Sequence, residues 1–178
     1  MYNYFKIIAR RWILKKNIVV VSLNNYLAKE VCLVLSQHLE MNFIDVDAHI
    51  EKELLLNKGD SLSNAEDYLT KLERNYIQKL TSKTNSIFSI DAETYLANNH
   101  IDYFRECDVV YLQTKIHSID LKQIKNKAER TRIEQNTSIH ENLNDFLTSS
   151  SEFIIENSDV KDINEIINEI EQVIASKE

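Results

Sequence analysis

IVVVSLNNYLAKEVCLVLSQHL, residues 18–39, carries the clearest structural signal in the chain. The uninterrupted apolar run at its start, residues 18–21, predicts a buried strand. The apolar residues that follow recur at helical spacing and predict a helix: Val31, Val34, Leu35 and Leu39. Residues 22–27 form a short connector between the two elements. A strand, a loop and a helix in this order are the setting in which many proteins hold a phosphate group.

The connector contains no glycine. A phosphate-binding loop needs glycine because its backbone N–H groups must turn inward without a Cβ atom in the way, and it needs Lys and Ser or Thr to meet the phosphates and Mg²⁺. The whole chain of 178 residues has one glycine, Gly59, and no proline. The setting of a phosphate site is therefore present without the residues that usually line it.

Four further apolar runs predict strands, and the segments between them predict helices. The expected strands are residues 41–47, 86–90, 109–112 and 153–155. The expected helices are residues 48–57, 63–80, 92–105 and 160–174, and the polar stretch 122–144 suits a mobile flap or exposed helices. Continuous apolar strands that alternate with amphipathic helices predict an α/β fold. We expect a three-layer α/β/α domain with a central five-stranded parallel sheet over residues 17–178.

Composition places the chain among ordinary globular proteins, with 43% apolar and 28% charged residues. No apolar run approaches the roughly 18 residues of a membrane span, and the N-terminus lacks the pattern of a secretory signal. We therefore expect a cytoplasmic protein. Cys32 and Cys107 form no CxxC motif and lie among apolar residues, so we expect buried free thiols. The five histidines lie far apart and give no metal-binding spacing.

Charge is distributed unevenly along the chain. The formal net charge is −7, and residues 1–16 contribute +5, which leaves −12 for the rest. An acidic body excludes a broad nucleic-acid surface, which needs clustered Lys and Arg. Phe5, Ile8 and Trp12 share one helical face, so residues 1–16 are expected to form a basic helical extension. This extension either packs on the acidic body or contacts anionic lipid or an acidic partner.

The second expected strand ends in FIDVD, residues 43–47, followed at helical distance by Ile50 and Glu51. This pattern resembles the signature of the shikimate kinase family, and the resemblance extends from about residue 17 to residue 175. It implies a P-loop fold of the nucleoside-monophosphate-kinase type. The activity it implies is phosphorylation of shikimate with MgATP, a step of aromatic amino acid biosynthesis.

The resemblance also assigns roles to individual residues. Asp45 corresponds to the carboxylate that organises the Mg²⁺ site, and Asp47 to the one that binds the shikimate hydroxyls and acts as base. The residues alone indicate a different interpretation of Asp45 and Asp47, namely a solvated strand end or a helix N-cap. Glu73 corresponds to a substrate-binding residue, and Arg130 to the arginine that a lid, here residues 115–145, holds over the ATP phosphates.

The departures from the family pattern are concentrated where the chemistry would occur. The glycine-rich loop aligns with residues 22–29, where every glycine is replaced and Ala28 stands at the position of the phosphate-binding lysine. Lys29 takes the position of the Mg²⁺ ligand, where we expect it to pair with Asp45. Glu30 adds a carboxylate that we expect in the first helical turn, at the end that would otherwise attract phosphate.

Three further positions depart from the family. Tyr26 is a bulky residue in the loop, where a nucleotide phosphate would pass. The family's glycine triplet after the third strand aligns with Asp91-Ala92-Glu93, which brings two carboxylates toward an anionic substrate. Thr70 stands where an arginine should bind the substrate carboxylate, and residues 140–146 lack the arginine expected late in the chain.

Two functions follow from these observations. One is a catalytically degenerate pseudoenzyme that serves as a binding or regulatory module, needs no cofactor, and acts through a protein partner or as a homodimer. In that case Asp47 and Glu73 are vestiges of a substrate site. The alternative is a divergent kinase for shikimate or another small molecule, with Mg²⁺ on Asp45, ATP on Lys29 and Arg130, and Asp47 as base.

Overall fold

The computed structural model describes residues 16–56, 65–115, 127–156 and 158–176. Five parallel strands form one sheet in the order β2-β3-β1-β4-β5. The strands are β1 (Ile18–Ser22), β2 (Asn42–Asp45), β3 (Ser86–Asp91), β4 (Asp108–Leu112) and β5 (Phe153–Ile155). The helices are α2 (Asn25–Leu39), α3 (Val46–Leu56), α4 (Ala65–Thr81), α5 (Ala92–Leu96), α6 (Lys127–Ser150) and α7 (Ile163–Ala175), with a 3₁₀ segment, η1 (Ala97–Phe104), after α5.

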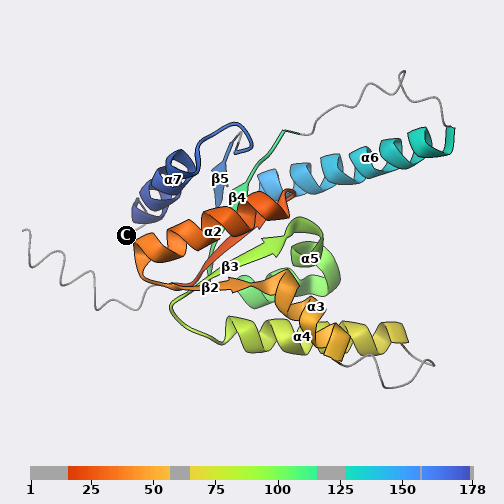
Figure 1. Ribbon diagram of the computed structural model, residues 1–178, viewed down its shortest axis with the longest axis horizontal. Helices are drawn as coiled ribbons and strands as arrows, with labels where there is room; N and C mark the ends of the chain where they lie inside the picture. The colour runs from red at the N-terminus through yellow and green to blue at the C-terminus, as the bar shows by residue number, and fades with distance from the viewer. Residues whose placement is uncertain (1–15, 57–64, 116–126, 157, 177–178) are drawn as a thin grey trace, which may run out of the picture.

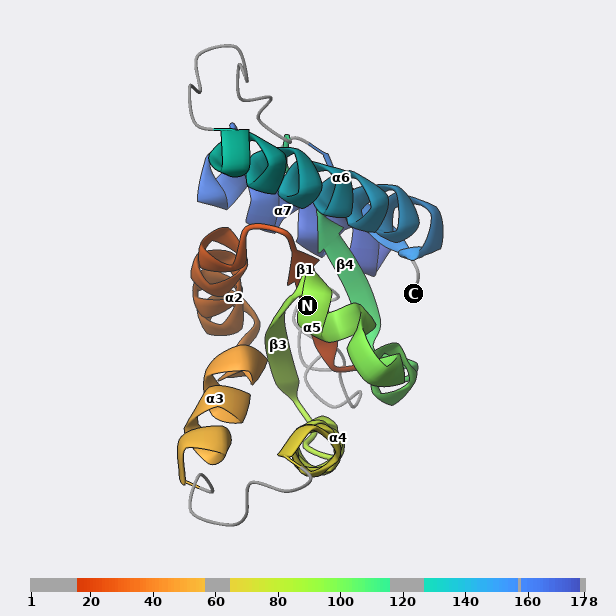
Figure 2. The same cartoon turned by 90° about the vertical axis from the view of Figure 1, so that its right-hand side faces the viewer.

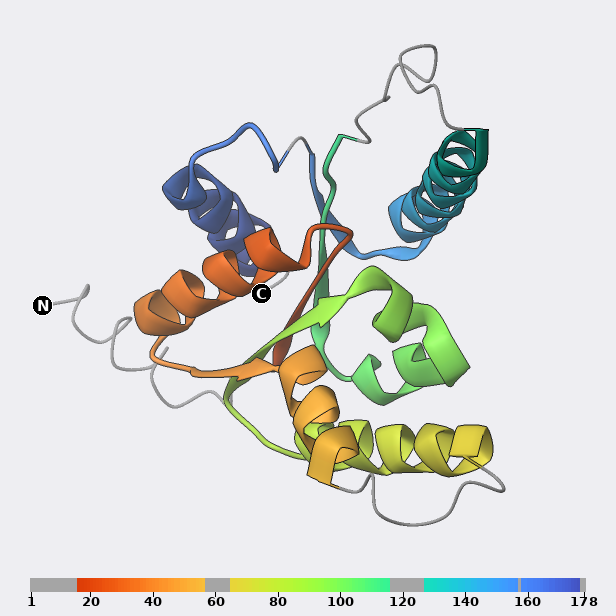
Figure 3. The same ribbon diagram turned by 45° about the vertical axis from the view of Figure 1, so that its right-hand side comes forward.

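Helices cover both faces of the sheet, as the expected three-layer α/β/α fold requires (Figures 1 and 3). On one face α2 and α7 pack over Val20 and Ile87, and on the other α3, α4 and η1 pack over Val19 and Phe88. Every residue of β1 is buried, because this central strand is covered from both sides. In Figure 2, α6 and α7 lie at one end of the molecule and α3 and α4 at the other.

The start of α2 differs from the expected boundary. We expected a connector over residues 22–27, whereas only Leu23 and Asn24 separate β1 from α2. Asn24 is the N-cap of the helix: its side chain accepts a hydrogen bond from the Leu27 N–H at 3.2 Å, and its carbonyl accepts one from the Ala28 N–H at 3.1 Å. A good capping residue and the absence of glycine let the helix begin three residues earlier.

Two other boundaries also shift. The second strand ends at Asp45 rather than at residue 47, and α3 begins at once. The helix expected over residues 92–105 is broken: α5 ends where the backbone of Ala97 becomes extended, and Asn98 and Asn99, inside η1, adopt left-handed conformations. The polar stretch after β4 contributes to the long helix α6, one of the two outcomes that we expected for it.

Asparagine occupies several positions whose left-handed backbone conformation usually favours glycine. Among the described residues, four have a positive φ angle: Glu40, Asn85, Asn98 and Asn99. Glu40 ends α2 in the left-handed conformation, and its N–H donates to the carbonyl of Ser36. Three of the four are asparagine, the residue other than glycine that best tolerates this conformation.

Some expectations fall outside the described residues. The basic helical extension lies almost wholly in residues 1–15, and Gly59 lies in residues 57–64. Both cysteines are buried free thiols, as expected, and burial raises the pKa of each thiol. None of the described helices combines the length and the apolar character needed to cross a membrane.

Candidate functional site

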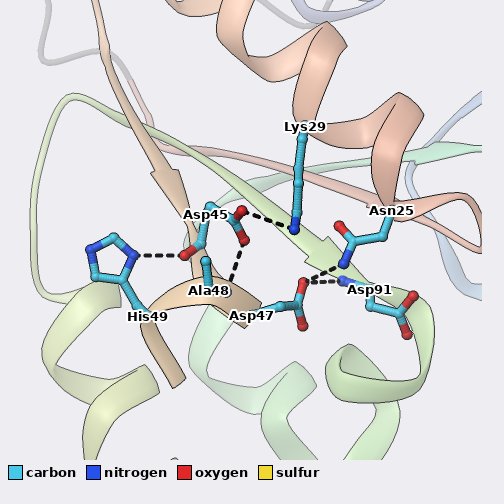
Figure 4. Close-up of polar contacts among 7 residues, drawn as sticks. All are labelled: Asn25, Lys29, Asp45, Asp47, Ala48, His49 and Asp91. Atoms are coloured by element: carbon cyan, nitrogen blue, oxygen red, sulfur yellow. Dashed lines mark hydrogen bonds and ion pairs between the residues drawn. The ribbon is translucent and has the colours of Figure 1, made fainter. Parts of the chain in front are cut away.

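Three polar residues at positions aligned with the family lie at the carboxyl ends of three neighbouring strands. Ser22 ends β1, Asp45 ends β2 and Asp91 ends β3. Ser22 is paired in register with Asp91, and Asp45 with Ser89. Because parallel strands end at the same edge of a sheet, Asp45 and Asp91 lie close to Asn25 and Lys29 of α2 and to Asp47 of α3 (Figure 4). This edge is where open α/β sheets bind their ligands.

Two hydrogen bonds of the Ser22 hydroxyl hold the connector between β1 and α2 against the sheet. The hydroxyl of the fully buried Ser22 donates to the carbonyl of Leu112 on β4 at 3.1 Å. It also accepts a hydrogen bond from the Asn24 N–H at 3.0 Å. The first residue of the aligned P-loop thus ties the loop to the neighbouring strand, where the family has a glycine.

The remaining aligned P-loop positions, 25–29, lie in the first turns of α2. The N–H groups of Leu27 and Ala28 are hydrogen-bonded to Asn24. Tyr26 projects into solvent with 77% of its surface exposed. Glu30 is exposed in the second turn, so the expectation of a first-turn carboxylate was wrong, because the helix begins earlier than the sequence indicated.

Lys29 and Asp45 form the ion pair that we expected. The Nζ atom of Lys29 lies 3.0 Å from Oδ2 of Asp45 (Figure 4), and the two side chains are 37% and 18% exposed. The other oxygen, Oδ1, accepts a hydrogen bond from the N–H of Ala48 at 3.0 Å. Asp45 is therefore also the N-cap of α3. The sequence indicated a helix N-cap as one alternative role for the pair Asp45 and Asp47.

Asp47 points toward α2 and the end of β3. Its Oδ2 atom accepts hydrogen bonds from Nδ2 of Asn25 at 3.2 Å and from the N–H of Asp91 at 2.9 Å. Burial raises the pKa of Asp47, and the charges of Asp91 and Asp45 raise it further, whereas hydrogen bonds from Thr94 and Asp91 act in the opposite direction. A carboxyl with a raised pKa is a better proton acceptor than an ordinary one, so its chemistry alone would suit a base.

Asp91 caps the next helix, α5, by accepting a hydrogen bond from the N–H of Glu93 at 2.8 Å. Burial raises the pKa of Asp91, and the charge of Glu93 adds to this effect. Hydrogen bonds from the backbone and the charge of His140 on α6 oppose it. His140 and Asn25 were not identified as site residues from the sequence: each stands at a position aligned with the family, but neither is the residue type that the family has there.

Glu73 lies in α4, and its described partners belong to η1. Its Oε2 atom is 3.5 Å from Nδ2 of Asn98 and 4.0 Å from Nε2 of His100. His100 is fully buried, and its Nδ1 atom, 2.8 Å from the carbonyl of Thr94, must donate because a carbonyl only accepts. These contacts join α4 to η1, and a substrate-binding role of Glu73 stays a prediction.

Arg130 lies in the first turn of α6, and its side chain is outside the described residues. The opposite end of α6 is anchored to the sheet by the buried Leu147 and by a 2.8 Å hydrogen bond from the hydroxyl of Tyr111 to Asn144. Arg130 is about 25 Å from Leu147 along the helix axis. The N-terminal end of α6 projects away from the sheet (Figure 1), and a role of Arg130 in holding phosphate stays a prediction.

The residues at this edge do not fit a magnesium–nucleotide complex. Each oxygen of Asp45 already has a partner, and the side chain at the metal-ligand position is an ammonium, which cannot coordinate a metal. Within the described part of the chain, no group of three or more His, Cys, Asp or Glu residues is arranged to hold a metal ion. The arrangement instead pairs one carboxylate, that of Asp45, with an ammonium of the same protein, that of Lys29.

Comparisons with known proteins agree with this architecture. Shikimate kinases of Acinetobacter baumannii, in complex with shikimate, and Bacteroides thetaiotaomicron have similar structures, with TM-scores of 0.67 and 0.64, each at 16% identity. The alignments cover 96% and 90% of this chain and 98% of each of those chains. The Aquifex aeolicus shikimate kinase has a TM-score of 0.63 at 17% identity, with coverage of 90% of this chain and 97% of that one.

No curated protein sequence matches the chain. The family model for shikimate kinase, however, matches residues 30–176, and this range starts just after the aligned P-loop positions 22–29. The fold is thus that of the P-loop shikimate kinases. Since the family model covers most of the sequence, the chain belongs to the shikimate kinase family.

Proposed function

We propose that this member of the family does not transfer phosphate and works instead as a binding or regulatory module. One observation carries the proposal: α2 begins at Asn25, so the positions that would cradle a phosphate form the first turns of a helix. The N–H groups of Leu27 and Ala28, which a P-loop would turn toward phosphate, are hydrogen-bonded to Asn24.

The loss of positively charged groups around the phosphate site supports the same conclusion. Phosphoryl transfer depends almost entirely on positioning and on positive charge around the transferred group. Ala28 replaces the phosphate-binding lysine, and the ammonium of Lys29 is engaged by Asp45 at 3.0 Å. Each loss of about 1.4 kcal/mol of transition-state stabilisation slows a reaction tenfold, so losing the lysine, the metal and the loop together leaves no useful rate.

The substrate side has changed as well. The A. baumannii shikimate kinase binds shikimate, whose carboxylate makes it an anion. In this chain Asp91 and Glu93 replace two glycines beside Asp47, and Thr70 replaces the arginine for the substrate carboxylate. Uncompensated carboxylates repel both shikimate and ATP, so neither ligand is expected to bind at this edge.

A binding module needs a partner, and we propose a protein or a second copy of this chain in that role. The basic residues 1–16, with a charge of +5, are the segment that we expect to contact an acidic partner or anionic lipid. Trimming residues 1–15 and measuring salt-dependent sedimentation with anionic vesicles tests this part of the proposal. Equal binding by the trimmed and full chains would contradict it.

Thermal denaturation with MgATP, shikimate and both together tests the proposal as a whole. A ligand that binds only the native state raises the melting temperature, so we expect no shift with any of the three additions. An active shikimate kinase serves as the positive control for ligand quality. A clear shift with MgATP that disappears in Lys29→Ala, together with phosphate transfer to shikimate, would favour the divergent kinase instead.

A further inference from the structure

One side of α6 is apolar and open to solvent. Ile139, Leu143 and Phe146 follow one another at spacings of four and three residues, so they form one stripe along the helix. Ile139 and Phe146 are 50% and 49% exposed, and Leu143 is half-buried. Large apolar side chains that are grouped on one surface and leave half of their area in water favour contact with another apolar surface.

Ile139 and Phe146 lie outside the side of α6 that holds the sheet. Asn144 accepts a hydrogen bond from Tyr111 at 2.8 Å, Thr148 accepts one from Gln113 at 3.1 Å, and Leu147 is fully buried. All of these contacts come from the last two turns of a helix of 24 residues, which is about 36 Å long. A helix in water owes most of its stability to the packing of an apolar face, so a partner on the stripe would stabilise the projecting part of α6 (Figure 1).

The charges of α6 and its end suit a second copy of the same helix. Residues 127–134 hold three basic and two acidic residues, a net charge of +1. Residues 141–152 hold three acidic residues and no lysine or arginine, a net charge of −3. Two copies packed antiparallel direct the basic end of each helix toward the acidic end of the other, whereas parallel copies place like charges side by side. The antiparallel arrangement also brings Ile139 of one copy against Phe146 of the other.

We infer that the stripe of Ile139, Leu143 and Phe146 is a dimer interface, formed by two copies of α6 packed antiparallel about a twofold axis beside Leu143. The inference rests on the proposed function and deepens it, because it names a second copy as the partner and locates the contact. In such an interface the same surface serves on both copies. A pair of single helices buries less than about 1,200 Å², at the low end of specific interfaces, so we expect a dissociation constant in the micromolar range.

Sedimentation equilibrium of the full chain at about 1–200 μM tests the interface. Wild type should pass from monomer to dimer as its concentration rises. Ile139→Glu and Phe146→Glu should each weaken association about tenfold or more, and neither should lower the melting temperature of the monomer, since both side chains are half exposed in a single copy. Leu33→Glu is the matched control: Leu33 lies on α2 with 48% exposure, and this variant should dimerise as wild type does.

Cysteine cross-linking tests the orientation. Asn142 and Ser149 are exposed and seven residues apart, so they share one side of α6, and the native cysteines are buried. Asn142→Cys lies near the proposed twofold axis and should form an intermolecular disulfide on mild oxidation, whereas Ser149→Cys alone should not. A mixture of Gln135→Cys and Ser149→Cys chains should link to each other. Efficient linking of Ser149→Cys to itself would indicate parallel helices and overturn the inference.

A full chain that stays monomeric over this concentration range overturns the inference, and so does a dimer that Leu33→Glu weakens as much as Phe146→Glu. A monomer whose melting temperature falls by several degrees in both Ile139→Glu and Phe146→Glu would also overturn it, because another segment of the same chain would then cover the stripe. None of these outcomes bears on the proposed loss of phosphate transfer. That proposal fails instead if wild type binds MgATP, whatever its oligomeric state.

Discussion

Ser22→Gly restores the first glycine of the family's phosphate loop, and the structure predicts that it destabilises this protein. The hydroxyl of Ser22 donates to the Leu112 carbonyl at 3.1 Å and accepts from the Asn24 N–H at 3.0 Å, in a fully buried position. Each lost hydrogen bond costs about 1 kcal/mol, and the added freedom of glycine costs about 0.5–1 kcal/mol. The free energy of unfolding should therefore fall by about 2–3 kcal/mol.

Urea denaturation of wild type, Ser22→Gly and Ser22→Ala measures this loss and separates its parts. Ser22→Ala removes only the hydroxyl, so it should lose about 2 kcal/mol, somewhat less than the glycine variant. In thermal scans, the glycine variant should melt roughly 5–10 °C below wild type. A Ser22→Gly protein as stable as wild type would refute the reasoning, because the connector would then not depend on this hydroxyl.

Three other changes have expected outcomes. Burial raises the pKa of Asp47 in the native state, so ionising this carboxyl costs the wild-type protein stability. That cost develops as pH rises from about 4, the ordinary pKa of Asp, through the raised pKa of Asp47. Asp47→Asn has no such cost, so its stability relative to wild type should increase over this pH range. Melting temperatures across that range check this, and a constant difference would contradict it. Asn99→Ala should cost about 1–2 kcal/mol, because Asn99 is exposed with φ 62°, while Asn99→Gly should be nearly neutral. Urea denaturation of both variants checks this, and equal stabilities would argue against a backbone cause. Leu147→Ala should cost about 2–5 kcal/mol, because this fully buried side chain anchors α6. A loss below about 1 kcal/mol in urea would mean that α6 is held elsewhere.

The sheet could be predicted from sequence because its strands are short, apolar and buried. The run of residues 18–21 and the strand at residues 153–155 both appear where expected, since a buried parallel strand leaves an uninterrupted apolar signal. Boundaries set by single side chains were harder to place. Asn24 starts α2 early by capping it, and the extended Ala97 with the left-handed Asn98 and Asn99 breaks the helix after β3, although neither change alters the apolar pattern.

The candidate site could be predicted only in part. The pairing of Lys29 with Asp45 followed from aligning opposite charges at two motif positions. The contact of Asn25 with Asp47 and the influence of His140 on Asp91 depend on how distant segments pack, and no local pattern marks them. The partners of Glu73 in η1 likewise depend on the two left-handed asparagines.

Calorimetric titration of the wild-type chain with MgATP tests the central claim most directly. The claim is that a protein with the fold of the shikimate kinases has lost the site for the phosphate donor, because α2 begins at Asn25 and Lys29 is held by Asp45. We predict no saturable heat of binding with MgATP, alone or with shikimate present. Saturable binding of MgATP that weakens strongly in Lys29→Ala would contradict the claim.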